Sequence, residues 1–94
     1  MSYTPSRLAL TTSLSAVQTA TNTSKVVIYL DDAAIGFTVR FTVDGSDPDD
    51  TKPGGQVKAG GYFDWNFDGR LGDQTLKFKI KADSGAPHAT IEVY

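Results

Sequence analysis

The sequence predicts an all-β protein built as a single antiparallel β-sandwich of about seven strands. Apolar and polar residues alternate over several short segments, which is typical of strands that bury one face. Turn-forming pairs such as Asp44-Gly45 and Pro53-Gly54 separate these segments at short intervals. A chain of 94 residues supports one hydrophobic core. We therefore expect one domain over residues 1–94, with residues 1–7 forming a short N-terminal arm.

The first third of the chain predicts two or three strands. Residues 7–21 are rich in threonine and serine and predict one or two short strands. The apolar residues there also fit a helix over residues 8–18, but the β-branched and hydroxyl side chains weigh against it. Residues 25–30 are apolar on both faces, which indicates a central strand or one whose outer face is covered.

The remaining strands follow from alternation with a period of two. Residues 36–43 are expected to turn four apolar side chains inward: Phe37, Val39, Phe41 and Val43. Residues 75–82 do the same with Leu76, Phe78, Ile80 and Ala82, and residues 89–94 with Ile91 and Val93. A further strand region covers residues 56–67 and is broken by a bend at Gly60-Gly61. Short strands at this spacing predict an Ig-like sandwich, with a small jelly roll as the alternative.

Composition excludes most catalytic and nucleic-acid-binding classes. The chain has no cysteine, one histidine (His88) and a formal charge of -2. We expect no enzyme, no cofactor and no broad nucleic-acid binding, because thiolate, multi-histidine and strongly basic sites are all missing. No apolar run is long enough to cross a membrane. The run Leu8-Ala9-Leu10 ends at Thr11, so we also expect no secretory signal.

The acidic turn over residues 44–50 has two interpretations. Four aspartates lie within seven residues, and calcium prefers several carboxylate oxygens. The alternative is a solvated turn whose aspartates cap backbone amides. We favour the capped turn, and calcium at Asp44–Asp50 is kept as the alternative.

A second stretch, Asp64-Trp65-Asn66-Phe67-Asp68-Gly69, matches the opening of a calcium loop. The acidic residue expected at the twelfth position is missing, because Thr75 stands there. We favour a strand followed by a hairpin turn at Asp68-Gly69.

The aromatic side chains of the same stretch are either core or surface. Alternation puts Phe63, Trp65 and Phe67 on one face, and we favour a buried aromatic ridge. The alternative is an exposed platform on which Trp65 or Tyr62 stacks against a sugar. The lysines of residues 77–81 are expected to form a solvated face, with an acidic partner as the alternative.

Two stretches resemble known families. Phe41-Thr42-Val43-Asp44-Gly45-Ser46-Asp47-Pro48 resembles the Y-T-x-D-G-S-x-P turn of the Ig-like C-terminal modules of chitobiases and related carbohydrate enzymes, with Phe41 in place of tyrosine. This resemblance implies a fold more than an activity. Residues 7–30 resemble, in their layout, small virion proteins of tailed bacteriophages: a Leu/Thr/Ser-rich opening, a short strand, a polar turn and a strongly apolar strand.

The second resemblance implies a non-enzymatic structural protein, most simply a capsid decoration (cement) protein that stabilises the head lattice. It implies a major capsid protein or another virion protein as partner, a homo-oligomer, and a place in the virion after synthesis in the host cytoplasm. A tail or neck accessory protein is one alternative. A carbohydrate-binding or adhesive Ig-like module is the other.

If the chain is a virion protein, we expect its contacts in two regions. The first is the N-terminal arm, with Tyr3, Pro5 and Arg7. The second is the loop over residues 47–55, with four charged side chains: Asp47, Asp49, Asp50 and Lys52.

Overall fold

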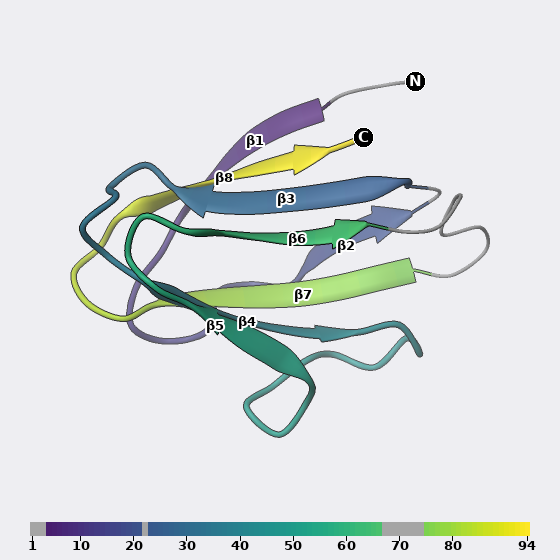
Figure 1. The fold of residues 1–94 in the computed structure, drawn as a ribbon. Coiled ribbons are helices and arrows are strands. Elements are labelled where there is room, and N and C mark those ends of the chain that lie inside the picture. The colour runs from purple at the N-terminus through teal and green to yellow at the C-terminus, as the bar shows by residue number, and fades with distance from the viewer. Residues whose placement is uncertain (1–3, 22, 67–74) are drawn as a thin grey trace.

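The computed structural model describes residues 4–21, 23–66 and 75–94, which form eight strands in two packed antiparallel sheets (Figure 1). The strands are β1 (Thr4–Ala9), β2 (Gln18–Thr21), β3 (Lys25–Leu30), β4 (Phe37–Thr42), β5 (Gly54–Val57), β6 (Tyr62–Asn66), β7 (Thr75–Ala82) and β8 (His88–Val93). The predicted all-β antiparallel sandwich is confirmed, with one strand more than the seven or so expected.

The strands pair as one long hairpin rolled into two layers. One sheet has the order β1-β8-β3-β6 and the other the order β2-β7-β4-β5. The first strand therefore pairs with the last, β2 with β7, β3 with β6, and β4 with β5. Within the predicted sandwich class, this nested order is the connectivity of the jelly-roll alternative.

The core lies between the two sheets and is built by the predicted alternation. In β7 every second residue is fully buried, and in β3 the inward positions Val26, Ile28 and Leu30 are buried in the same way. β3 lies between β8 and β6, which confirms the central strand that its two-sided apolar character predicted. Its outward positions are half-buried, so this face of the sheet is also partly enclosed.

The end of β4 departs from the predicted pattern. The strand stops at Thr42, and Val43, which was expected to point inward, lies beyond it and is 43% exposed. By the same alternation Thr38 and Thr42 belong to the outward face of the strand, yet both are buried. The hydroxyl of Thr42 donates to the carbonyl of Ser46, because the chain after β4 folds back beside the outer face of the strand.

The N-terminal third forms strands and no helix. β1 and β2 occupy residues 4–9 and 18–21, so the helix considered for residues 8–18 does not form. Residues 4–7 of the expected arm belong to β1, which is hydrogen-bonded along its length to β8. They are therefore part of a sheet edge and not a separate N-terminal arm, while residues 1–3 lie outside the described residues.

The bend predicted at Gly60-Gly61 connects the two sheets. It joins β5 in one sheet to β6 in the other, so residues 54–66 form two strands in different layers. Gly60 has a φ of 83°, a left-handed conformation in which a side chain is strained. This connection brings Tyr62 to the outer face of the first sheet.

Candidate binding groove

An open groove of about 470 Å³ lies on the outer face of the β1-β8-β3-β6 sheet. Its floor comes from outward residues of β3 and β8, and its walls from Tyr62 and the turns at residues 32–35 and 60–61. Three tyrosines line it: Tyr29, Tyr62 and Tyr94. A volume of this size is within the range of pockets that hold small ligands.

Strand register determines which groove side chains are neighbours. Tyr29 on β3 is paired with Tyr62 on β6, so the two tyrosines lie side by side on the outer face. Val27, two residues earlier, is paired with Asp64 on one side and with Glu92 on the other. On the groove face, the Tyr29–Tyr62 pair therefore lies next to a second row of residues. In that row, carboxylates flank Val27 on both sides.

Glu92 is the polar centre of the groove. The Tyr29 hydroxyl donates to its Oε2 at 3.0 Å, and the Tyr94 hydroxyl donates to its Oε1 at 2.9 Å. These hydrogen bonds stabilise the neutral phenols next to a carboxylate and raise the pKa of Tyr29 and of Tyr94 above the usual value. Glu92 thereby fixes the position of two aromatic rings.

The charges around the groove are unevenly distributed. Lys25, Asp32 and Glu92 line it. Arg7, on the neighbouring edge strand β1, pairs with Asp31 at 2.6 Å, and the Thr90 hydroxyl donates to the same carboxylate at 2.8 Å. The bond from Thr90 and then that from Arg7 lower the pKa of Asp31. The positive charge of Arg7 is thus matched by Asp31, and the charged residues that line the groove in the described part of the chain are Lys25, Asp32 and Glu92.

The structure separates the aromatic residues of β6 into two groups. Phe63 and Trp65 pack against the core, and Trp65 makes edge contacts with Phe41 at 5.3 Å and with Phe63 at 4.6 Å between ring centroids. Phe63 and Trp65 are therefore half-buried against the core, on the side that the predicted aromatic ridge required, while Phe67 lies outside the described residues. Tyr62 points the other way and is 66% exposed. Of the two residues considered for an exposed platform, Tyr62 alone has a suitable position.

The acidic turn lies at the opposite sheet. Asp44 accepts a hydrogen bond from the amide of Ser46 at 3.0 Å, and Asp49 accepts one from the amide of Thr51 at 2.8 Å. The two aspartates therefore cap their own loop. Hydrogen bonds from the hydroxyls of Ser46 and Thr51, and then those from the two amides, lower the pKa of both carboxyls. Within the described part of the chain, no group of three or more histidine or acidic residues converges as metal ligands do.

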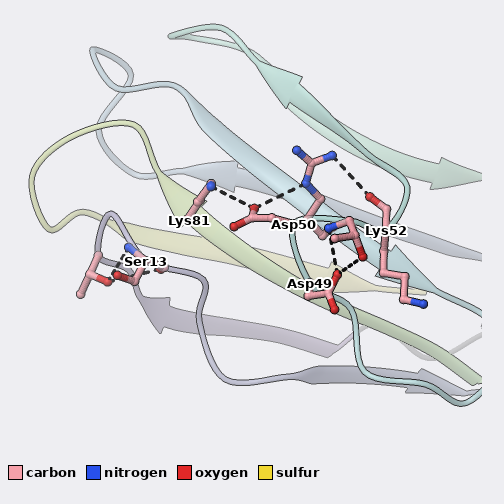
Figure 2. Close-up of polar contacts among 8 residues, drawn as sticks. Ser13, Asp49, Asp50, Lys52 and Lys81 are labelled. Carbon is pink, nitrogen blue, oxygen red and sulfur yellow. Dashed lines mark hydrogen bonds and ion pairs between the residues drawn. The ribbon is translucent and has the colours of Figure 1, made fainter.

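The other two aspartates of the turn meet the lysine face. Lys81 donates to Asp50 at 3.0 Å, and the guanidinium of Arg40 lies 3.8 Å from the same oxygen (Figure 2). Asp47 lies 3.5 Å from the ammonium of Lys77. The lysine face is consequently half-buried and not freely solvated, and this protein's own loop provides the acidic partner that the sequence left open.

The calcium-loop opening at residues 64–69 is described in part. Asp64 and Asn66 are exposed on the outer face of β6, while Trp65 between them points into the core. Residues 67–69, which include the expected hairpin turn, lie outside the described residues.

The predicted contact residues do not form one surface. Arg7 belongs to β1, whereas Asp47, Asp49, Asp50 and Lys52 belong to the β4–β5 loop of the opposite sheet (Figure 1). Pro5 lies in β1 opposite Glu92, and Tyr3 lies outside the described residues. His88 is exposed at the start of β8.

Sequence reasoning identified Tyr62 but missed the rest of the groove. Glu92 was interpreted as an ordinary outward residue, and Tyr29, Tyr94 and Lys25 were not singled out. The sequence feature that pointed to the groove was the apolar character of residues 25–30 on both faces, which indicated a central strand or one whose outer face is covered. The pairing of Glu92 with two tyrosines depends on β8 lying beside β3, which alternation does not reveal.

The chain matches no known protein-family model, no curated protein sequence and no solved structure. Among the residues that the structure describes, no helix is long and apolar enough to cross a membrane.

Proposed function

We propose that this protein is a non-enzymatic binding module whose groove on the β1-β8-β3-β6 sheet binds a carbohydrate. The observation that carries the proposal is Tyr62, a residue that is 66% exposed at the wall of an open groove. An exposed aromatic face offers a flat apolar surface to the C–H groups of a sugar ring. Glu92, Asp32 and Lys25 provide hydrogen-bonding groups for the hydroxyls beside it.

The composition of this face favours a small polar ligand over a large protein partner. The exposed large apolar side chains of the described residues are Val17, Val43 and Tyr62, and of these Tyr62 alone lines the groove. Stable protein interfaces bury roughly 800 Å² on each partner around an apolar centre. One exposed tyrosine beside carboxylates is a better match for a sugar.

The test is a screen of the protein against immobilised plant, fungal and bacterial polysaccharides, followed by calorimetry with oligosaccharides of each polysaccharide bound. We expect Tyr62→Ala to weaken binding at least 10-fold, and Tyr62→Phe to retain most of it, because stacking uses the ring. Val43→Ala is the matched control, because it truncates an exposed apolar side chain outside the groove.

Equal binding by the wild type and Tyr62→Ala would overturn the proposal. So would the failure of every polysaccharide to bind. A protein partner retained on the wild type and lost from Tyr62→Ala would reassign the groove to protein recognition.

A second candidate is the virion role: a capsid decoration protein, or a tail or neck accessory protein, that acts as a homo-oligomer on a lattice. The observation that favours it is the nested eight-strand connectivity, because jelly rolls of this kind occur in viral capsid proteins as well as in lectins. The layout of residues 7–30 points in the same direction. In this role the charged β4–β5 loop or the edge strand β1 would contact the major capsid protein.

Light scattering on the size-fractionated protein, with calcium and with a chelator, tests this second candidate. A trimer or larger ring would support it, and co-sedimentation with phage particles would be the next experiment. A Lys52→Ala and Asp47→Ala double variant should then weaken particle binding. A calcium-independent monomer that binds no particle would contradict the virion role.

A further inference from the structure

We infer that the groove recognises the end of a sugar chain, with the terminal sugar held against a wall that closes the groove at one end of the sheet. This inference rests on the proposed carbohydrate-binding function and specifies which part of a polysaccharide the groove takes. It is carried by the place of the two turns that line the groove and by the position of Tyr62 beside them.

The first step concerns the direction of the groove. Its floor follows the outward residues of β3, from Lys25 through Val27 to Tyr29. The strand from Lys25 to Tyr29 extends over about 13 Å, which leaves room for a short stretch of a sugar chain. Beyond Tyr29 the lining passes from strand residues to turn residues, so the groove runs along β3 toward the turns.

The second step concerns the wall at that end. β3 and β6 are antiparallel, so the connection that follows β3 and the connection that precedes β6 lie at the same end of the sheet (Figure 1). Residues of both connections line the groove: Asp32, Ala33, Ile35, Gly60 and Gly61. The two connections are in contact, because a Cβ at Gly60 would lie 3.9 Å from the carbonyl oxygen of Ala33. A sugar chain that lies along β3 therefore meets a wall of backbone at this end.

Hydrogen bonds hold both connections in shape. The Asp32 carboxylate accepts a bond from the amide of Ala34 at 2.9 Å, and the amide of Ile35 donates to the Asp32 carbonyl at 3.3 Å. In the other connection, the amide of Gly61 donates to the carbonyl of Lys58 at 3.0 Å. The wall is thus made of two hydrogen-bonded turns.

The third step concerns what this end offers to a terminal sugar. Tyr62 comes directly after Gly61 and is paired with Tyr29, so this exposed aromatic residue lies at the closed end of the groove. A terminal sugar also has one hydroxyl more than an interior sugar, at the position where the next linkage would be. The carboxylate of Asp32 lines the wall, and it has acceptor sites beyond the one that the Ala34 amide uses. Stacking and this additional hydroxyl both favour a chain end over a chain interior.

The experiment uses oligomers of two to eight units from three series: β-1,4-glucose, β-1,3-glucose and β-1,4-N-acetylglucosamine. The octamers are also prepared in two blocked forms, with a 2-aminobenzamide label on the reducing end or with a benzylidene acetal on the non-reducing end. Calorimetry measures the affinity and the number of proteins bound per chain. We expect one blocked octamer to bind about 10-fold or more weakly than the free octamer, because the added group clashes with the wall. The other should bind as tightly as the free octamer.

Chain length gives a second measurement. We expect the affinity to rise until the groove is filled and then to stay constant, with one protein bound per chain up to eight units. Ala33→Trp, which extends the wall into the groove, should weaken binding and make the affinity level off at a shorter oligomer. Ala16→Trp is the matched control and should bind as the wild type does, because Ala16 is an exposed alanine between β1 and β2 that does not line the groove.

Equal affinities of the two blocked octamers would overturn this inference and leave carbohydrate binding intact. So would two or more proteins bound to one octamer, or wild-type binding by Ala33→Trp. If a polysaccharide binds but none of the three oligomer series does, the inference fails and the proposed function stands. If no polysaccharide and no oligomer binds, both fail.

Discussion

At the scale of single residues, neighbouring aromatic residues of β6 have opposite roles. Trp65 packs against Phe41, Phe63 and Phe78, while Tyr62 projects from the other face of the same strand. Trp65→Ala should lower the free energy of unfolding by about 3–5 kcal/mol, because it empties the aromatic end of the core. Tyr62→Ala should change it by about 0.5 kcal/mol or less. Urea denaturation followed by circular dichroism measures both.

A small effect of Trp65→Ala on stability would contradict the packing described for this residue. It would also return Trp65 to consideration as a surface residue that contacts ligand.

The tyrosines around Glu92 lead to a prediction at alkaline pH. Hydrogen bonds to Glu92 raise the pKa of Tyr29 and Tyr94 above the value of about 10 that they have in the unfolded chain. Their contribution to stability is therefore complete below pH 10 and is lost as the pH rises through the raised folded values. Glu92→Gln should move the tyrosinate absorbance midpoints of these two residues toward 10 and flatten the alkaline loss of stability.

Asp64→Asn is the control for this titration, since Asp64 does not contribute to the raised pKa of either tyrosine. Unchanged midpoints in Glu92→Gln would show that the two phenols do not bond to this carboxylate in solution.

At the scale of elements, strand β5 depends on a glycine. A Cβ at Gly54 would collide with the carbonyl oxygen of Val39 on the paired strand β4. Gly54→Ala should therefore separate the start of β5 from β4 and lower the free energy of unfolding by about 1–3 kcal/mol. Gln56→Ala, at an exposed position of the same strand, should have little effect. Amide hydrogen exchange along β4 and β5, with urea denaturation, measures the change.

Full amide protection of the β4–β5 ladder in Gly54→Ala would contradict this geometry. It would mean that the two strands can separate slightly without losing their hydrogen bonds.

The same scale shows why some features could be predicted from the sequence and others could not. Period-two alternation in residues 75–82 is a local property, so the inward and outward faces of β7 follow directly from the residue order. Burial of Thr42 depends on the following loop, which returns beside the outer face of β4 so that the Thr42 hydroxyl meets the carbonyl of Ser46. The alternation of residues 36–43 contains no sign of this loop contact.

The candidate site was predictable to a smaller degree. Tyr62 could be predicted as a candidate binding residue because it belongs to an aromatic run. Its exposure follows because the opposite face of β6 is the one that packs against the core. Glu92 becomes part of the groove because β8 inserts between β1 and β3. This neighbour relation joins segments distant in the sequence, and it requires knowledge of the strand order.

At the scale of the whole molecule, nested pairing predicts an order of folding. β4 and β5 are joined by a short connection, whereas β1 pairs with β8 at the far end of the described chain. Closing short loops costs less conformational entropy than closing long ones. We expect the β4–β5 hairpin with β7 to form early and the β1–β8 pairing to form late.

Paired core truncations test this order. Val39→Ala, in β4, should mainly slow folding, and Leu8→Ala, which packs against the core from β1, should mainly speed unfolding. Stopped-flow folding and unfolding rates over a range of urea concentrations separate the two effects. The reverse assignment would place the nucleus at the β1–β8 pair instead.

The place of β8 also has a consequence for synthesis on the ribosome. β8 lies between β1 and β3, so the groove sheet lacks an inner strand until residues 88–93 have emerged. During translation β1 therefore lacks the strand it pairs with, and the Tyr29 hydroxyl lacks Glu92 as its hydrogen-bond acceptor. The nascent chain can close this sheet, and create its groove, once β8 has left the exit tunnel.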